Sequence, residues 1–349
     1  MKEQNLIMLK KTLLDGNKKQ FKANLHCHSN LSDGALTPEE LKRVYKEHGY
    51  DVLAITDHCR PCDHSDLTDE DFLMLTGYEA YIRPSKSCTY DVWSPEVHLN
   101  LFAKEPHNLK YVCYNSNSCK YFPKERHSEL EKVGSEKQRE YTTEYVNEFI
   151  RTAVENGYLV AYNHPFWSME SEERILSYKG YFSLEIFNTG SYKLNGIENA
   201  EQLYDKMLRL GYSVGCHGGD DNHNKKPFGD PDCDSFDGHT MILADRLEYS
   251  EIAAALEAKE CYASRGPRIN EISIHTDDDG DYVHVECSPA KAVYLFVGAK
   301  NVKSKKASDG LLTSVDIPLD PAARYVRISV WDEGGKSATS RGFLRDEWA

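Results

Sequence analysis

The sequence has no long hydrophobic run, no low-complexity tract and no excess of positive charge. A helix that spans a bilayer needs about 18 consecutive apolar residues, which this chain does not contain. The formal net charge of −14 argues against binding along a nucleic-acid backbone, because such binding depends on clustered lysine and arginine. We therefore expect neither a membrane nor a nucleic-acid polymer as partner. A small anionic substrate fits this charge if bound metal ions reverse it locally.

We expect neither a secretory leader nor a disulfide scaffold. Near the N-terminus the only apolar run covers residues 6–9, and two lysines follow it at once, so no secretory signal fits. The ten cysteines are scattered, and several, such as Cys27 and Cys216, lie in apolar strand-like runs. Cys59 and Cys62 form a CxxC without a second one to complete a four-thiolate zinc site, so a redox pair or half a metal site is the alternative there. We predict a cytoplasmic protein with reduced thiols.

Short β-rich apolar runs alternate with longer amphipathic segments in the first two thirds of the chain. This order is typical of βα units repeated around a parallel sheet. Seven segments are predicted as strands: 21–26, 51–56, 74–80, 97–103, 159–163, 182–187 and 213–216. Three segments are predicted as outer helices: 37–48, 140–156 and 196–210. The long, polar, tyrosine-rich stretch 104–139 is predicted to be an insertion over the active-site face.

After Pro267 the pattern changes to short alternating runs separated by Gly, Asp and Lys. These runs are 271–275, 282–287, 292–297 and 325–330. They predict a small antiparallel β domain. The 349 residues fit one barrel of about 250 residues with such an appendage. We place the boundary near Arg268, which gives an α/β domain over residues 1–267 and a β-rich domain over 268–349.

Histidine, aspartate and glutamate recur at or near the ends of the predicted strands. The positions are His26, His28, Asp57, His58, Glu79, His98, His164, Asp221 and His223. In a parallel barrel the C-terminal strand ends open onto one face, where these side chains would meet. A single histidine at a strand end is more often a hydrogen-bonded polar group than a ligand. Nine such residues in apolar surroundings need a shared explanation, because each carries a desolvation cost.

The spacing of these residues favours a metal site. Residues two apart on an extended strand point the same way, so His26 and His28 can bind one metal together, as can Asp221 and His223. Glu79 could bridge two metals with its two oxygens. Imidazole and carboxylate together suit Zn, Mn or Fe without any thiolate.

Four motifs give the sequence a specific resemblance. The run LHCHSNLSDG at 25–34 is followed by AITDH at 54–58, NHP at 163–165 and GDDNH at 219–223. In this order, over roughly residues 22–266, they resemble the polymerase and histidinol phosphatase (PHP) superfamily. The resemblance implies an α/β fold, a distorted seven-stranded (β/α)7 barrel, that hydrolyses phosphomonoesters or phosphodiesters.

The same resemblance implies two or three divalent metal ions, Zn, Mn or Fe, and nine ligands. The first metal would be held by His26, His28, Glu79 and Asp221. The second would be held by Glu79, His98 and His164. The third would be held by Asp33, His58 and His223. Asp57 would support the fold or orient a ligand imidazole.

The implied reaction is hydrolysis of a small phosphorylated substrate by a metal-activated hydroxide. Metals lower the pKa of bound water from about 15.7 toward about 7 and neutralise charge on the phosphoryl oxygens. His217, Asp220 and Asp57 are candidates for protonating the leaving oxygen, because they lie close to ligands in sequence. A buried structural role is the alternative for His217.

Three arginines are candidates for binding the phosphate in a bidentate manner: Arg60, Arg265 and Arg268. Arg60 lies two residues after His58, and the other two flank a turn after the last barrel-like segment. An exposed arginine is the alternative at each position. Aromatic residues gather in 78–93 and 111–121, where they would stack on a base or sugar, or pack beneath a long loop.

Three other functions remain open from the residues alone. The same metal chemistry could hydrolyse a carboxylic or carbamic ester or an amide, and a phosphate-binding arginine would argue against that. A noncatalytic metal-binding module is the second alternative. Oxidoreductase chemistry is the third, although GGDD at 218–221 lacks the spacing of a dinucleotide-binding glycine motif.

Overall fold

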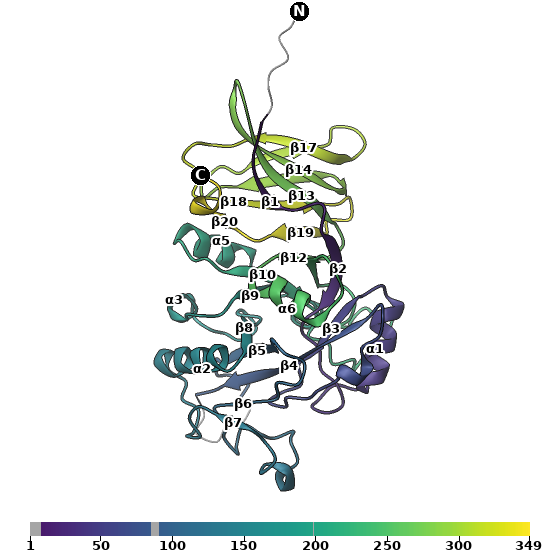
Figure 1. The fold of residues 1–349 in the computed structure, drawn as a ribbon, viewed down its shortest axis with the longest axis vertical. Coiled ribbons are helices and arrows are strands. Elements are labelled where there is room, and N and C mark those ends of the chain that lie inside the picture. Colours follow the sequence, from purple (N-terminus) through teal and green to yellow (C-terminus); the bar gives the residue numbers. More distant parts are fainter. Residues whose placement is uncertain (1–7, 85–90, 198) are drawn as a thin grey trace, which may run out of the picture.

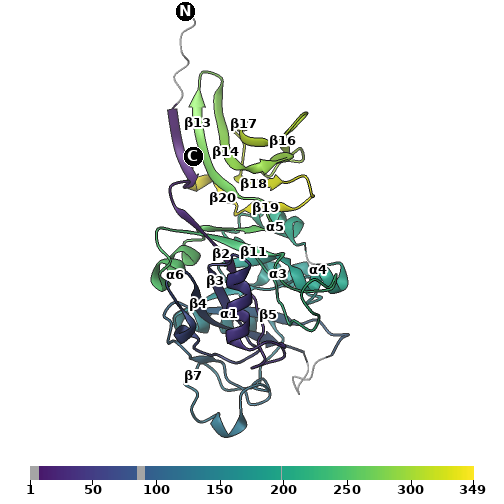
Figure 2. The ribbon, with the colours of Figure 1, turned by 90° about the vertical axis from the view of Figure 1, so that its right-hand side faces the viewer.

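The computed structural model describes residues 8–84, 91–197 and 199–349. The molecule is elongated, with an α/β part at one end and the C-terminal strands at the other (Figures 1 and 2). The strand β1 (Met8–Leu14) lies among the C-terminal strands, although it comes from the other end of the chain. In the described residues, no helix is long and apolar enough to cross a membrane.

All seven predicted segments of the α/β part form strands. They are β2 (Lys19–Asn24), β3 (Val52–Ile55), β4 (Leu73–Ile82), β5 (Val97–Ala103), β8 (Tyr158–Tyr162), β9 (Ser183–Asn188) and β10 (Gly215–Gly219). They are neighbours in one sheet in the order β10-β9-β8-β5-β4-β3-β2, which continues through β11 (His239–Ala244) and β12 (Cys261–Ser264). The strand positions were readable because all of these strands except β2 are short and buried along their whole length.

The expected (β/α)7 barrel is not confirmed, whereas the mixed α/β class is. Strand β5 runs antiparallel to both β4 and β8, and β11 runs antiparallel to both β2 and β12. Among the described residues no backbone ladder joins β10 to β11, although the Thr240 hydroxyl bridges them by accepting from Gly218 N at 3.2 Å and donating to Gly218 O at 2.8 Å. A fully buried strand has the same apolar sequence in either direction, so the sequence did not reveal these reversals.

The helices flank this sheet, and α1 faces the viewer in Figure 2. They are α1 (Pro38–Glu47), α2 (Thr143–Glu155), α3 (Glu172–Ser177), α4 (Thr189–Asn195), α5 (Glu201–Arg209) and α6 (Tyr249–Glu257). Helix α1 begins as predicted, because Thr37 Oγ1 accepts from Glu40 N at 3.2 Å and the Glu40 carboxylate accepts from Thr37 N at 2.9 Å. The helix predicted at 196–210 starts only at Glu201, since Gly196, at φ +68°, terminates α4.

All four segments predicted as strands after Pro267 form strands, and residues 269–349 contain four more; all eight pair in antiparallel fashion. They are β13 (Ile269–Asp277), β14 (Gly280–Ala290), β15 (Ala292–Phe296), β16 (Lys303–Lys306), β17 (Leu312–Pro318), β18 (Tyr325–Trp331), β19 (Ser337–Ser340) and β20 (Phe343–Leu344). One sheet has the order β1-β13-β14-β17, and β19 extends the main sheet by pairing with β12. The main sheet thus includes strands from both sides of the boundary proposed at residue 268, and the division into two domains stays a prediction.

Candidate metal centre

Two histidines that follow β2 point toward the same pair of carboxylates, as their spacing predicts. His26 Nε2 lies 3.2 Å from Asp221 Oδ1, and His28 Nε2 lies 3.0 Å from the same oxygen. Glu79 on β4 lies 3.2 Å from His26 Nε2 and 3.5 Å from His28 Nε2. The structure therefore brings together the four residues assigned to the first metal.

Glu79 is the central carboxylate of the site. Its Oε1 lies 3.0 Å from His98 Nδ1 and 3.3 Å from His164 Nε2, and its Oε2 lies 3.0 Å from His58 Nδ1. Burial by itself would raise the pKa of Glu79, but the imidazoles of His98, His26 and His58 hold it well below its usual value. An ionised carboxylate with two differently placed oxygens is suited to bridge two cations.

Asp33 stands beside the remaining histidines. One of its oxygens lies 3.5 Å from His223 Nε2 and the other 3.7 Å from His58 Nε2. The ring centroid of His28 lies 4.4 Å from that of His58 and 4.4 Å from that of His223, on which it stacks. The three residues assigned to a third metal therefore adjoin the first group.

The donor atoms fit divalent metal ions. The clustered side chains form several groups in which one potential ligand atom of each residue lies within 4.8 Å of the others. One such group is His28, Asp33, His58 and His223. Buried polar atoms usually have a hydrogen-bond partner, yet six ligand atoms of the cluster have none of acceptable geometry. These atoms are His26 Nε2, both nitrogens of His28, His58 Nδ1, Glu79 Oε2 and His98 Nε2. Imidazole nitrogens and carboxylate oxygens are the ligands that Zn, Mn and Fe accept.

Backbone strain is concentrated at the same strand ends. His164, just beyond β8, has φ +22°, and Asp221, just beyond β10, has φ +52°. Cys59, directly after His58, has φ +46°. Non-glycine residues adopt this region only when the surrounding structure imposes it, and such residues cluster at functional sites.

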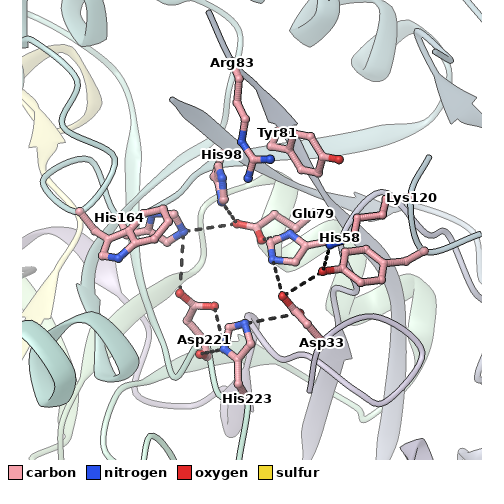
Figure 3. A pocket seen from close by; sticks show the side chains of 12 residues that line it. Asp33, His58, Glu79, Tyr81, Arg83, His98, Lys120, His164, Asp221 and His223 are labelled. Carbon is pink, nitrogen blue, oxygen red and sulfur yellow. Dashed lines mark hydrogen bonds and ion pairs between the residues drawn. The ribbon is translucent and has the colours of Figure 1, made fainter. Parts of the chain in front are cut away.

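A cavity of about 330 Å³ opens over the cluster (Figure 3). Seven proposed ligands line it: Asp33, His58, Glu79, His98, His164, Asp221 and His223. The rest of its wall is Tyr81, Arg83, Lys120, Tyr121 and Trp167. Lys120 and Tyr121 belong to the stretch 104–139, so the predicted insertion does reach the site.

Two carboxylates that the sequence did not single out support ligand imidazoles. Glu185, on β9, lies 3.0 Å from His26 Nδ1, and Glu96 lies 3.4 Å from His98 Nε2. Glu96 also pairs with the guanidinium of Arg83. A charged residue inside an apolar strand, as in the run SLEIFN at 183–188, was the available signal for Glu185.

The three candidate proton donors do not line the cavity. Asp57 accepts from Ser29 N at 2.9 Å and from Ser29 Oγ at 2.6 Å, so it holds the backbone that follows His28 and makes no bond to a ligand imidazole. His217 is fully buried beside Ser183 Oγ at 2.9 Å, and burial lowers the pKa of His217 to about 4. Neighbouring positions in sequence point in different directions at these strand ends.

Asp220 is buried behind its neighbour Asp221. It accepts from Thr189 Oγ1 at 2.6 Å, Tyr45 OH at 2.7 Å and Phe236 N at 2.8 Å. Burial raises the pKa of Asp220 to about 7 against the opposing effect of these hydrogen bonds. Its contacts support the strand end and place no oxygen at the cavity wall.

The three candidate arginines also lie off the cavity wall. Arg60 donates to Leu31 O at 2.8 Å and Tyr121 O at 2.9 Å, Arg265 pairs with Asp237 at 2.7 Å, and Arg268 is exposed. The arginine that does line the cavity is Arg83. The nine cysteines in the described residues, including Cys59 and Cys62, are free thiols.

Comparison with known proteins identifies the family. The family model of the PHP domain matches residues 24–211, more than half of the 349-residue chain. The chain belongs to the PHP domain family. The resemblance drawn from the four motifs is thereby confirmed. No curated protein matches the chain.

Solved structures with a similar arrangement are distant in sequence. A two-domain protein from Bacteroides vulgatus ATCC 8482, described as containing a predicted PHP-like metal-dependent phosphoesterase, is 14% identical with a TM-score of 0.46, and 95% of each chain is covered. A proposed metal-dependent phosphoesterase from Bifidobacterium adolescentis ATCC 15703 is 19% identical with a TM-score of 0.40, over 61% of this PHP chain and 92% of that one. An amidohydrolase from Chromobacterium violaceum, solved with sulfate and no metal, is 17% identical with a TM-score of 0.40, over 68% and 96%. At these values the family assignment depends on the sequence match alone.

Proposed function

We propose that this PHP protein hydrolyses a phosphate ester, mono- or diester, at a centre of two or three divalent cations, Zn, Mn or Fe. The observation that carries the proposal is a cluster of nine imidazole and carboxylate side chains, seven of which line a cavity that also has cationic side chains in its wall. The ligands would be His26, His28, Glu79 and Asp221 for one ion, Glu79, His98 and His164 for a second, and Asp33, His58 and His223 for a third.

The cations, when bound, would act as Lewis acids that acidify a water molecule and neutralise charge on the phosphoryl oxygens. The chain's own contribution is to hold the ligands rigidly before any ion arrives. The imidazoles of His26 and His28 are fully buried, and Glu79 contacts five histidines. Such preorganisation avoids the cost of arranging charged groups during the reaction.

Arg83 and Lys120 favour a phosphorylated substrate over a neutral ester or amide. Both line the cavity, and neither offers a lone pair to a metal in its charged form. Arg83 pairs with Glu96, which fixes the guanidinium at the wall, and its planar fork matches phosphate oxygens. Arg83 thus takes the role that the sequence assigned to Arg60, Arg265 and Arg268.

The proposal is tested with the metal-reconstituted protein and three substrates: p-nitrophenyl phosphate, bis-p-nitrophenyl phosphate and a p-nitrophenyl carboxylic ester. We expect metal-dependent release from a phosphate compound and its loss in the double variant Glu79→Ala/His164→Ala. The two phosphate compounds separate monoester from diester preference. Release from the carboxylic ester alone would transfer the function to a carbon-ester hydrolase, and no turnover with metals bound would indicate a noncatalytic module.

A further inference from the structure

Glu185 makes contacts to two different proposed metal ligands. The side chain is fully buried on β9. One carboxylate oxygen lies 3.0 Å from His26 Nδ1, and the other accepts from the backbone N–H of His164 at 3.0 Å. Glu185 therefore connects the segment after β2 with the segment after β8.

Asn188 extends this connection to a third ligand. Its side-chain amide donates to Glu185 Oε2 at 3.0 Å and to Asp221 Oδ2 at 3.1 Å. Its carbonyl oxygen accepts from Ser191 N at 2.8 Å and caps α4. The pair Glu185–Asn188 thus contacts His26, His164 and Asp221, which come from three separate strand ends.

The contact to His26 fixes which nitrogen faces the cluster. A carboxylate only accepts hydrogen bonds when ionised, so His26 presents its proton on Nδ1 and its lone pair on Nε2. Nε2 is the atom that approaches Glu79 and Asp221 at 3.2 Å and has no hydrogen-bond partner of acceptable geometry.

We propose that Glu185, aided by Asn188, is a positioning residue that orients His26, His164 and Asp221 for metal binding. The inference rests on the proposed metal centre and adds residues outside its nine ligands. Direct ligation by Glu185 is the competing role, since a carboxylate oxygen of Glu185 and one ring nitrogen each of His26 and His164 lie within 4.8 Å of one another. Against it, both oxygens of Glu185 already accept from N–H donors.

The test is titration of Mn²⁺ and of Zn²⁺ into metal-free Glu185→Gln and wild-type protein by calorimetry. The amide NH₂ of glutamine would either face the N–H donors of His164 and Asn188, which it cannot satisfy, or face His26 Nδ1 and favour the tautomer with the proton on Nε2, the nitrogen that faces the cluster. We expect the Kd of the tightest site to rise about 10- to 100-fold, as for other residues that orient metal ligands. The absorption spectrum of bound Co²⁺ should change as well, because His26 is reoriented.

Glu170→Gln is the matched control. Glu170 is also buried and also accepts from several donors, Tyr141, Tyr178 and Arg174, but it contacts none of the proposed ligands. We expect its metal affinity and Co²⁺ spectrum to match the wild type. Unchanged Kd values and spectrum in folded Glu185→Gln would overturn the proposal, as would equal losses in both variants.

Asn188→Ser keeps the inference testable if Glu185→Gln does not fold. Serine retains the cap on α4 but lacks the amide that reaches Glu185 and Asp221. We expect a smaller rise in Kd in the same direction, and no rise would count against the proposal. Because the readout is metal binding, a wild type that binds metal but cleaves no phosphate ester would refute the proposed function and leave this inference standing.

Discussion

At the scale of single residues, a buried histidine that lies near a proposed metal ligand in the sequence need not take part in the reaction. His217 lies fully buried against Ser183 and off the cavity wall. His217→Gln should keep metal content and kcat, while the free energy of unfolding falls by about 1–3 kcal/mol through the disturbed buried contact. Denaturant titration and steady-state kinetics on one preparation check both. A folded, metal-loaded variant without turnover would restore His217 as a proton donor.

Substitutions of Arg83 and of Arg265 can be compared to separate substrate binding from structural support. Arg83 lines the cavity, whereas Arg265 pairs with Asp237 elsewhere. A charge-assisted hydrogen bond contributes about 1.5–3 kcal/mol, so Arg83→Gln should raise KM for a phosphate ester about tenfold or more. Arg265→Gln should leave KM unchanged. If both variants bind substrate like the wild type, the phosphate is held elsewhere.

The cluster of proposed ligands could be predicted from sequence and the residues that contact it could not, for a physical reason. His26 and His28 share one short motif, and strand geometry alone places them on one side. Glu185 and Arg83 gain their roles only from contacts across the fold, with His26 and Glu96 respectively. Asp57, His217 and Asp220 lie off the cavity wall although they are close in sequence to proposed ligands, because that closeness does not determine where a side chain points.

At the scale of elements, Asp237 links the loops around β11, β12 and β19. It accepts from Arg265 at 2.7 Å and from Lys336 at 2.8 Å. Burial raises the pKa of Asp237, but the hydrogen bonds and charges of Arg265 and Lys336 lower it below its usual value overall. A depressed pKa means that this contribution to stability is complete above the unfolded value of about 3.9 and is lost as pH falls through the folded pKa.

This pKa predicts how the free energy of unfolding changes at acidic pH. Asp237→Asn should lower the free energy of unfolding at pH 7. As the pH falls below about 4, the variant should lose less stability than the wild type. Urea midpoints of metal-free protein, measured from pH 7 to 3, provide the comparison without interference from metal release. Parallel pH curves for variant and wild type would show that Asp237 does not titrate in this way.

Strand positions were predictable but strand directions were not. Burial of whole strands such as β5 and β8 gives apolar runs that mark their place in the chain. Direction depends on how connections cross the sheet, and β5 runs against both of its neighbours. The proposed ligands still meet, because His98 on β5 has its ring directed to Glu79.

At the scale of the whole molecule, the C-terminal strands share a core with the α/β part. Met241 of β11 and Tyr262 of β12 pack with Ile272, Val293 and other residues beyond 268. Arg327 of β18 is fully buried and pairs with Asp205 and Glu201 of α5 at 2.9 and 3.2 Å.

A truncated chain of residues 1–267 should therefore not fold alone. It would expose this shared core and leave β1 without β13 and β12 without β19. Size-exclusion chromatography and thermal unfolding of the fragment test this. A monomeric fragment with a cooperative transition would instead support two independent domains divided near Arg268.

The most direct test of the central claim relates activity to bound metal. Protein stripped with a chelator receives Mn²⁺ or Zn²⁺ in steps, with metal per chain and hydrolysis of a phosphate ester measured at each step. We predict no turnover in the stripped protein and a rise to a plateau at two or three ions per chain. Turnover that persists without metal, or ions that bind without restoring any phosphate ester hydrolysis, would contradict the account.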